Sequence, residues 1–502
     1  MSTMKLGWAE VDITPEKKIS LAGQFAERIS EYVEKPLTAT ALAIEAGEEQ
    51  LVMVSTDLAK APIKLMWDIR ARLADNGLGL DPQKVIISAI HTHTGPVFPG
   101  GQITAGNVIK GLREMLEGYL APGQKYIEKV NVSNNPEIAT SQEVYDLLLE
   151  RITACILDAW KNRAAGSFSN AFGRAAVGMC RRADYSDGTA QMWGETNTAV
   201  FTEVEGGNDS GMELLYVFNS EKKLTGVVVN IACPAQCVQH RLFVSPDFWG
   251  EAKKRIRAYF GEDLFMLPLC SAAGDQCPVD IVRWVEPYSD VNDPNIIRQH
   301  PVKRKADPSM FDLEGMYKAG KRIANEIIEV WNEGLDEAQE DIIFKHHIHN
   351  MQLPLRRATL TDLHNAERAI KDYLRDHPGD VDYNDVANMQ INLGVIRRFE
   401  LQETVEAIDT EVHIIRLGSV AIATNPFELF LDYGNQIKAR ALCEQTFLIQ
   451  LCCGSEGYLP TEKAEKHGHY SAFIASGQVG HAGGEQLVRE TLKDINTMFA
   501  NG

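Results

Sequence analysis

The chain has 502 residues, enough for one large enzyme domain or about three average domains. Hydrophobic residues make up 44% and charged residues 24%, which is typical of a soluble globular protein and excludes a disordered chain or a disulfide-stapled miniprotein. The 69 acidic and 50 basic residues give a formal net charge of −19, which argues against nucleic acid or an anionic lipid surface as the main partner.

Short apolar runs that end in polar or glycine-containing turns recur along the chain. Runs of Val, Ile and Leu with little alternation are typical of strands buried on both faces. Helical periodicity fills stretches between them, and this alternation predicts an α/β architecture. The predicted strands are Gln50–Asp57, Val85–Ile90, Thr225–Cys233, Asp263–Cys270, Val420–Thr424 and Thr446–Cys452, and the predicted helices run up to about Leu73 and over Val144–Trp160, Met316–Trp331 and Leu363–Leu374.

No internal repeat, low-complexity segment or Ser/Gly-rich linker divides the chain, so we expect a single domain over residues 1–502. The charge-rich, helical segment 358–404 lies between strand-like stretches and is expected to be a helical insertion. The Pro- and Asp-rich stretch Tyr288–Pro308 is expected to be a surface loop.

The sequence also indicates where the protein resides. The N-terminus, MSTMKLGWAEVDITP, lacks the apolar core of a signal peptide, and no stretch approaches 18 uninterrupted apolar residues. The nine cysteines are an odd number and lack the paired spacing of a structural zinc site, so we expect most of them to be buried, reduced thiols. These features predict a cytoplasmic protein without membrane insertion.

Histidines follow the predicted strand Val85–Ile90 in the motif HTHTGP. The end of a strand is where open α/β sheets build ligand sites. If the strand continues through the motif, its period of two places His91 and His93 on one face, suited to a metal ligand and a neighbouring acid or base. The spacing alone is a weak signal, since it recurs at His347/His349 and His467/His469.

Carboxylates, a thiol and tyrosines follow other predicted strands. In GDQCP, Cys277 is a candidate nucleophile if a histidine stabilises its thiolate; the alternative is a small buried thiol. In NPFELF, Glu428 is expected in the first helical turn after a strand, where it either complements the helix dipole or binds a metal. Tyr458 and Tyr470 bracket the histidine-containing loop YLPTEKAEKHGHY and are either packing residues or site residues.

Together these motifs resemble the catalytic domain of the neutral/alkaline (non-lysosomal) ceramidases, which are zinc-dependent amidases. HTHTGP resembles the family motif H-T-H-[ST]-G-P, which implies that His91 binds zinc and His93 touches substrate. GDQCP matches the family's Gly-Asp-x-Ser-Pro, with Cys277 in place of the active-site serine. The resemblance spans almost the whole chain and implies mixed β-sheets flanked by helices. It also includes GWAEVDITP, LAGQFAERI, PLTATALAI, VMVSTDL and NPFEL.

The resemblance implies a zinc site completed by residues from later in the chain. Glu428 matches the family's zinc-binding glutamate, and Tyr458 and Tyr470 keep the spacing of its ligating tyrosine and second active-site tyrosine. The family's second zinc histidine is missing, because Pro234 stands at its place in NIACPAQCVQH, and the nearest histidine is His240. The expected ligands of a single Zn²⁺ are His91, His240, Glu428 and Tyr458.

Further roles follow from the same resemblance. The family's active-site arginine matches either Arg181 or Arg182 in CRRADY, while Gly23 and Asp275 are implied to contact the substrate. The family's C-terminal β-sandwich has no counterpart here, since the sequence stops soon after the tyrosine loop. With no secretion signal either, long-chain ceramide is not the expected substrate.

These observations predict a zinc-dependent hydrolase that cleaves an amide of a soluble small molecule with a metal-activated water. His93, Tyr470 and the arginine would assist catalysis, and Cys277 would contact the substrate. Two alternatives remain: a cysteine hydrolase that uses Cys277 as nucleophile, and a non-catalytic homologue that binds a small molecule. The bond cleaved and the oligomeric state are not indicated by the sequence.

Overall fold

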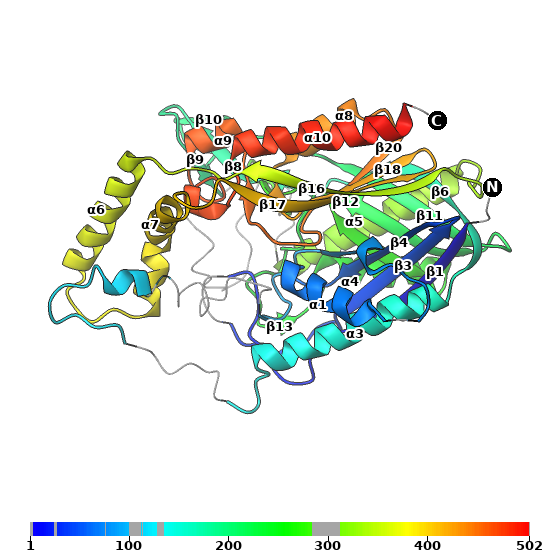
Figure 1. The fold of residues 1–502 in the computed structure, drawn as a ribbon, viewed down its shortest axis with the longest axis horizontal. Coiled ribbons are helices and arrows are strands. Elements are labelled where there is room, and N and C mark those ends of the chain that lie inside the picture. Colours follow the sequence, from blue (N-terminus) through cyan, green and yellow to red (C-terminus); the bar gives the residue numbers. More distant parts are fainter. Residues whose placement is uncertain are drawn as a thin grey trace.

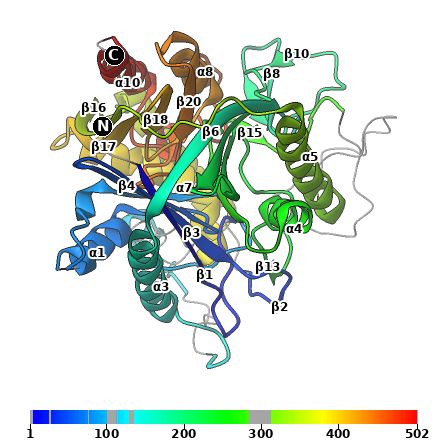
Figure 2. The same ribbon diagram turned by 90° about the vertical axis from the view of Figure 1, so that its right-hand side faces the viewer.

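The computed structural model describes residues 4–24, 28–75, 77–99, 112, 114–127, 135–283 and 312–500 of the chain. Two β-sheets pack against each other at its centre, and helices cover their outer faces (Figures 1 and 2). The predicted class, mixed β-sheets flanked by helices, is confirmed. The predicted surface loop Tyr288–Pro308 lies outside the described residues.

The larger sheet has eight strands in the order β14-β12-β11-β6-β1-β3-β4-β5. Its inner strands pair antiparallel, whereas the edge strands β14 and β5 run parallel to their neighbours. A parallel pair needs a crossover connection, and α1 (Ile63–Leu73) and α4 (Phe248–Phe260) supply one at each edge. The strands are β1 Lys5–Asp12, β3 Thr38–Ala46, β4 Glu49–Thr56, β5 Val85–Ala89, β6 Ala164–Arg174, β11 Gly211–Asn219, β12 Leu224–Ile231 and β14 Phe265–Cys270.

The smaller sheet has four strands in the order β16-β17-β18-β20. β16 and β17 form a long antiparallel pair, and β18 runs parallel to β20 with helix α8 in the connection between them. The C-terminal helix α10 packs on β16, β17 and α8, along the outer face of this sheet (Figure 1, red). The bounds are β16 Phe344–Pro354, β17 Ala407–Leu417, β18 Val420–Thr424, β20 Gln445–Ile449, α8 Leu431–Arg440 and α10 His481–Phe499.

The main core fills the space between the two sheets. Leu267 of β14, Ile415 of β17 and Phe447 of β20 belong to one cluster of buried side chains. Full burial of such a side chain stabilises the fold by about 1.5–3 kcal/mol, so these apolar runs hold the sheets together. Helix α3 (Ser141–Lys161) covers β1 and β3, and α5 (Asp312–Glu333) packs on α4 over a second core.

Two helices, α6 (Leu360–Asp376) and α7 (Tyr383–Leu401), lie between β16 and β17 in the chain. They form a hairpin to one side of the sheets (Figure 1, yellow) and pack around a small core of their own. Because β16 and β17 pair through Pro354 and Ala407 at its base, the hairpin leaves the sheet register intact.

The loops at the ends of the main strands contain short strand pairs and single helical turns. Three of these elements matter for the site: β19 and β21, which pair parallel, and β15, which pairs antiparallel with β7. These and the remaining elements are β2 Tyr32–Val33, β7 Met179–Cys180, β8 Arg182–Tyr185, β9 Ala190–Met192, β10 Phe201–Val204, β13 Phe243–Val244, β15 Gln276–Cys277, β19 Glu428–Leu429, β21 Tyr458–Leu459, α9 Glu462–His467 and the 3₁₀ turns Pro82–Lys84 and Ile474–Ser476.

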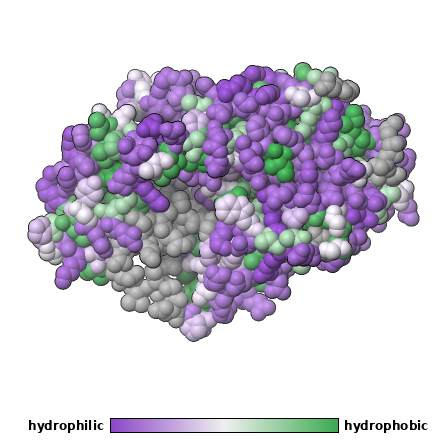
Figure 3. Space-filling model, in the orientation of Figure 1, coloured by the Kyte–Doolittle hydropathy of each residue, from purple (hydrophilic) through white to green (hydrophobic). Residues whose placement is uncertain are grey.

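The surface and the cysteines also bear on the predictions. On the face seen in Figure 3, hydrophobic residues lie in small patches between hydrophilic ones. Within the described ranges, the search for a helix long and apolar enough to cross a membrane finds none. None of the nine cysteines forms a disulfide, and all are buried except Cys443, which is half-buried.

Candidate functional site

His91 lies just beyond β5 and is buried at the edge of the larger sheet. Its Nδ1 is 2.6 Å from the carbonyl oxygen of Ala59. A carbonyl only accepts, so Nδ1 donates to it, and Nε2 is the ring nitrogen that faces Glu428 and that binds a metal once it carries no proton. The strand does not continue through this motif, because β5 ends at Ala89 and His91 has a left-handed φ of 65°.

The turn nevertheless brings the two histidines together. Nε2 of His93 is 3.4 Å from Nε2 of His91, and its other partners are Oε1 of Gln239, 3.1 Å from Nδ1, and Nε2 of Gln236, 3.0 Å from Nε2. Burial, reinforced by the neighbouring His91, lowers the pKa of His93 well below its ordinary value. His93 is therefore neutral, with the Gln239 oxygen placing its proton on Nδ1.

Gly23 lies directly against the ring of His93. It has a left-handed φ of 93°, and a β-carbon there would fall 2.1 Å from Cγ of His93. No larger residue fits while the histidine keeps its place. The structure thus places Gly23 at the predicted site, where its lack of a side chain makes room for the imidazole.

Glu428 supplies the acidic group of the site. Its Oε2 is 3.4 Å from Nε2 of His91, and its Oε1 is 3.9 Å from Nζ of Lys60. Burial by itself would raise the pKa of Glu428, but His91, Lys60 and the Tyr458 hydroxyl outweigh it and lower that pKa well below its ordinary value. Glu428 is not in a helical turn as predicted: it lies in β19, and α8 begins only at Leu431.

Two tyrosines and an arginine enclose the carboxylate. The Tyr458 hydroxyl hydrogen-bonds Glu428 and Tyr470, and it accepts a hydrogen bond of 3.2 Å from Nη2 of Arg181. The two phenol rings meet edge to face, with centroids 5.6 Å apart. Burial, together with Glu428, raises the pKa of both tyrosines, so both hydroxyls keep their protons at neutral pH. We call His91, His93, Glu428 and Tyr458 the His91–Glu428 cluster.

The two candidate arginines have different environments. Arg181 reaches the His91–Glu428 cluster and also donates to the carbonyl of Gly274 at 2.9 Å. Arg182 forms a buried two-pronged ion pair with Glu205 and donates to the backbone carbonyls of Gly468 and Tyr470. Arg182 therefore holds the loop that carries Tyr470, while Arg181 faces the site.

Cys277 is fully buried next to Arg181. Its Sγ lies 3.2 Å from the carbonyl oxygen of Val279, and burial raises the pKa of the thiol to about 12. Within the described residues, Cys277 contacts Val279 and Trp193, and no histidine is among these contacts. The structure therefore shows the buried-thiol alternative that the sequence left open.

The rest of the GDQCP motif supports the backbone. Oδ1 of Asp275 accepts a hydrogen bond of 2.9 Å from the amide of Leu431, at the start of α8. A β-carbon on Gly274 would lie 2.2 Å from the carbonyl oxygen of Glu428, so the tight turn approaches this strand. Asp275 thus holds the backbone at the start of α8, and its contact with substrate stays a prediction.

His240 is not brought to the His91–Glu428 cluster. Its Nε2 lies 3.3 Å from Oδ1 of Asp312, at the start of α5. Among the described residues, none of the three close groups of potential metal ligands contains His240, His91 or Glu428. His240 was expected as a zinc ligand, but its imidazole lies on the Asp312 carboxylate instead.

The sequence did not point to Lys60, Gln236 or Gln239, which also contact the site. A signal for Lys60 was available, because it follows β4 in TDLAKAP just as His91 follows β5. The two glutamines lie in the segment that the resemblance marks for the missing zinc histidine. Side-chain amides carry no pattern that separates a site residue from a solvent-exposed one.

The donor set fits a zinc ion. Ligands about 2.0–2.1 Å from tetrahedral zinc are separated by roughly 3.3–3.4 Å. The distances from Nε2 of His91 to Oε2 of Glu428 and to Nε2 of His93 are both 3.4 Å. An imidazole, an ionised carboxylate and a phenol therefore lie next to one another in this buried site.

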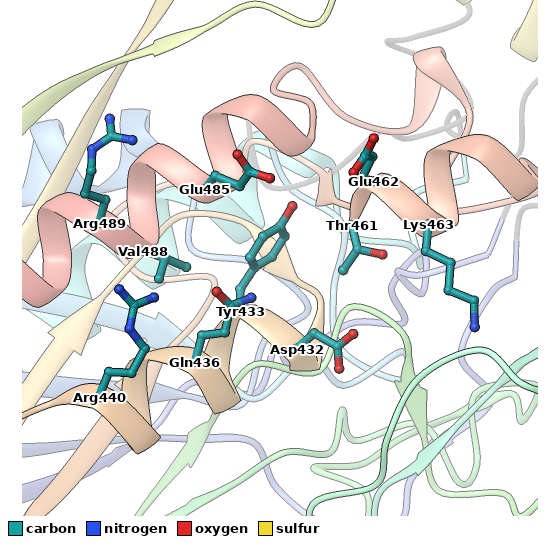
Figure 4. Close-up of a pocket in the computed structure, with 10 residues that line it drawn as sticks. All are labelled: Asp432, Tyr433, Gln436, Arg440, Thr461, Glu462, Lys463, Glu485, Val488 and Arg489. Atoms are coloured by element: carbon teal, nitrogen blue, oxygen red, sulfur yellow. The ribbon is translucent and has the colours of Figure 1, made fainter.

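Two pockets lie outside this cluster. One of about 390 Å³ is formed by α8, α9 and α10 and is lined by both acidic and basic side chains around Tyr433 (Figure 4). Another of about 400 Å³ lies between Pro354–Arg357 and Gly480–Gly483. Neither is lined by a predicted site residue.

No protein-family model matches the sequence, and the search of curated proteins finds no match either. Among solved structures, the fold is similar to the neutral ceramidase from Pseudomonas aeruginosa, with a TM-score of 0.65 and 15% identity over 100% of this chain and 75% of that one. A ceramidase complexed with C2 gives a TM-score of 0.66 and 12% identity over 100% of this chain and 76% of the other. The chain thus has a ceramidase-like fold.

Proposed function

We propose that this protein is a zinc-dependent hydrolase whose metal is held by His91, Glu428 and Tyr458. The observation that carries the proposal is the 3.4 Å approach of Nε2 of His91 to Oε2 of Glu428, in a buried site where a backbone carbonyl holds Nδ1 of His91 and Glu428 keeps its charge. The ceramidase-like fold supports the same chemistry. His240 is not part of the proposed ligand set.

Bound zinc would lower the pKa of a coordinated water and so supply hydroxide near neutral pH. The chain's own groups would act on the substrate. Arg181 and the Tyr470 hydroxyl would donate hydrogen bonds to the carbonyl oxygen as it gains negative charge. Neutral His93 would accept a proton at Nε2 and pass it to the leaving amine.

We propose an amide of a soluble small molecule as the substrate class, and a cytoplasmic location. The charge of −19 supports a soluble substrate over one at an anionic membrane surface, and the free cysteines support the cytoplasmic location. Ceramide is the substrate named by the structural neighbours, but two long alkyl chains need a large apolar mouth. On the face shown in Figure 3 the hydrophobic patches are small. We therefore expect short-chain N-acyl compounds to be better substrates than ceramide.

A second function, binding without turnover, is favoured by one observation. His240 stays on Asp312, so the proposed site has one histidine fewer than expected. A non-catalytic homologue would keep the fold and bind a small molecule without hydrolysing it. The cysteine mechanism has no such support, because the Cys277 thiol is buried and protonated.

The deciding experiment measures metal content and hydrolysis together. Purified protein is analysed for zinc, then assayed on short-chain N-acyl amides and on ceramide in detergent, before and after chelation and zinc return. We expect zinc at this site and chelator-sensitive amide hydrolysis that zinc restores. Zinc-replete protein without turnover would favour the binding alternative, and hydrolysis that survives complete metal removal would refute the proposal.

A further inference from the structure

Three clusters of metal-binding side chains occur in the described residues, all away from the His91–Glu428 cluster. In two of them, an arginine or lysine already forms an ion pair with a carboxylate of the cluster. Arg70 lies 2.8 Å from Glu411, and Lys463 lies 2.9 Å from Asp184. A fixed cation beside the carboxylate repels a metal ion, so neither is a strong site. The clusters are Glu411, His413 and Cys453; Asp184, Glu205 and His467; and His347, His349 and Asp494.

The third cluster, formed by His347, His349 and Asp494, is different. The only ion-pair partner that the described residues give Asp494 is His349, with 2.6 Å between Oδ2 and Nδ1. This charge-assisted contact holds the imidazole and the carboxylate in place. No lysine or arginine in the described ranges pairs with this carboxylate.

Secondary structure builds this cluster from two elements. His347 and His349 are two residues apart on the edge strand β16, so both point to the same face of the sheet, and their ring centroids are 5.9 Å apart. Helix α10 packs on that face and brings Asp494 next to them. One ligand atom from each residue lies within 4.8 Å of the others, which small side-chain rotations can close onto one ion.

The types of ligand atom in the cluster indicate which metal it would bind. Two imidazoles and one carboxylate suit zinc and other late divalent first-row metals, whereas calcium and magnesium prefer oxygen ligands alone. The side chains of His349 and Asp494 are 28% and 16% exposed, and His347 lies on the surface. An ion held there would be open to solvent, and water would complete its coordination.

We propose that His347, His349 and Asp494 form a second, surface site for a divalent transition metal such as zinc. The ion ties the C-terminal helix α10 to the edge strand β16, so its binding free energy adds to the stability of the folded chain. The site is independent of the proposed catalytic metal. The HxH spacing on β16, which no part of the proposed hydrolase uses, thereby acquires a role.

Zinc stoichiometry in four forms of the full-length protein tests both sites at once. Chelator-stripped wild type, Glu428→Gln, His347→Ala and the double variant are titrated with zinc, and calorimetry counts the bound ions. If both sites exist, the four forms bind two, one, one and no ions. If only the surface site exists, the result is one, one, none and none. If only the His91–Glu428 site exists, it is one, none, one and none, which overturns this inference and leaves the proposed function standing.

A second variant guards against a folding artefact. Asp494→Asn keeps the shape of the carboxylate and should lose the same ion as His347→Ala. The matched control is His364→Ala, which removes an exposed histidine of α6 and should retain every ion. Zinc should also raise the Tm of Glu428→Gln, and this shift should vanish when His347→Ala is added. An unchanged zinc-dependent shift in the double variant would contradict the site.

Discussion

Glu428 and Tyr458 stand directly opposite each other in the parallel ladder of β19 and β21. Opposed residues project from the same face of a sheet, so a carboxylate and a phenol from distant segments reach the same point. The backbone of Gly477 packs closely against this ladder, because a β-carbon on Gly477 would lie 1.9 Å from the carbonyl oxygen of Tyr458. The ladder thus fixes two of the proposed ligands on rigid backbone.

Glu428→Gln is expected to strip the catalytic metal while the fold survives. The amide keeps the size of the side chain but loses the charge that zinc needs. Even changes outside the ligand shell cost about 10–100-fold in metal affinity, so loss of a direct ligand should cost more than about 100-fold. Competition with a chelator measures this affinity. Glu465→Gln, a partly buried carboxylate elsewhere, is the control and should bind zinc like the wild type.

Gln236→His is expected to strengthen zinc binding. The Gln236 side chain is buried, and its Nε2 already lies 3.0 Å from Nε2 of His93. An imidazole at this position would offer a further nitrogen ligand in the segment where the family resemblance places its second zinc histidine. We expect a lower Kd for zinc by about tenfold or more, since outer-shell effects alone are of that size. A higher Kd for zinc in a folded variant would show that this segment does not face the metal.

Cys277→Ser is expected to retain most activity. The thiol sits on the Val279 carbonyl, and a hydroxyl can donate to the same oxygen. If Cys277 were the nucleophile, serine would replace it with a far more basic group, and kcat/KM would fall by several orders of magnitude. Steady-state kinetics on the best amide distinguish the two. A near-inactive variant that still binds zinc would restore the cysteine mechanism.

Arg182→Met is expected to lower the free energy of unfolding by about 3–5 kcal/mol. It leaves Glu205 as a buried charge without its main partner and frees the loop that carries Tyr470. Urea unfolding measures the loss. Adding Glu205→Gln should recover a large part of it, because the unpaired charge is then gone. Equal stability of the single and double variants would contradict this account.

Asp275→Asn is expected to change how stability depends on pH. Burial raises the pKa of Asp275 to about 6 in the folded protein, above its ordinary value of 3.8. The folded state therefore holds this proton more firmly, a contribution fully present below about pH 4 and lost as pH rises through 6. The Asn variant has no such loss. The free energy of unfolding of the variant minus that of the wild type should therefore rise by about 3 kcal/mol between about pH 4 and pH 6. Urea unfolding at several pH values checks the trend, and a constant difference would refute it.

Much of the framework follows from local sequence. Val85–Ile90 and Val420–Thr424 correspond to β5 and β18 within one residue, because short, mostly apolar runs without polar alternation are typical of strands buried on both faces. The predicted helix Val144–Trp160 lies within α3. The alternating strand β16, FKHHIHNMQLP, was not predicted, since its exposed face carries polar side chains that break the apolar run.

The motifs HTHTGP and NPFELF and the tyrosine loop were enough to single out His91, Glu428 and Tyr458, which lie together in the structure. The three-dimensional contacts are needed to see that Arg181 rather than Arg182 faces the site and that His240 stays on Asp312. Adjacent residues of an extended chain point in opposite directions, and the partner that each one meets comes from a segment far away in sequence. Such contacts depend on how the two sheets pack, which local patterns of hydrophobicity do not encode.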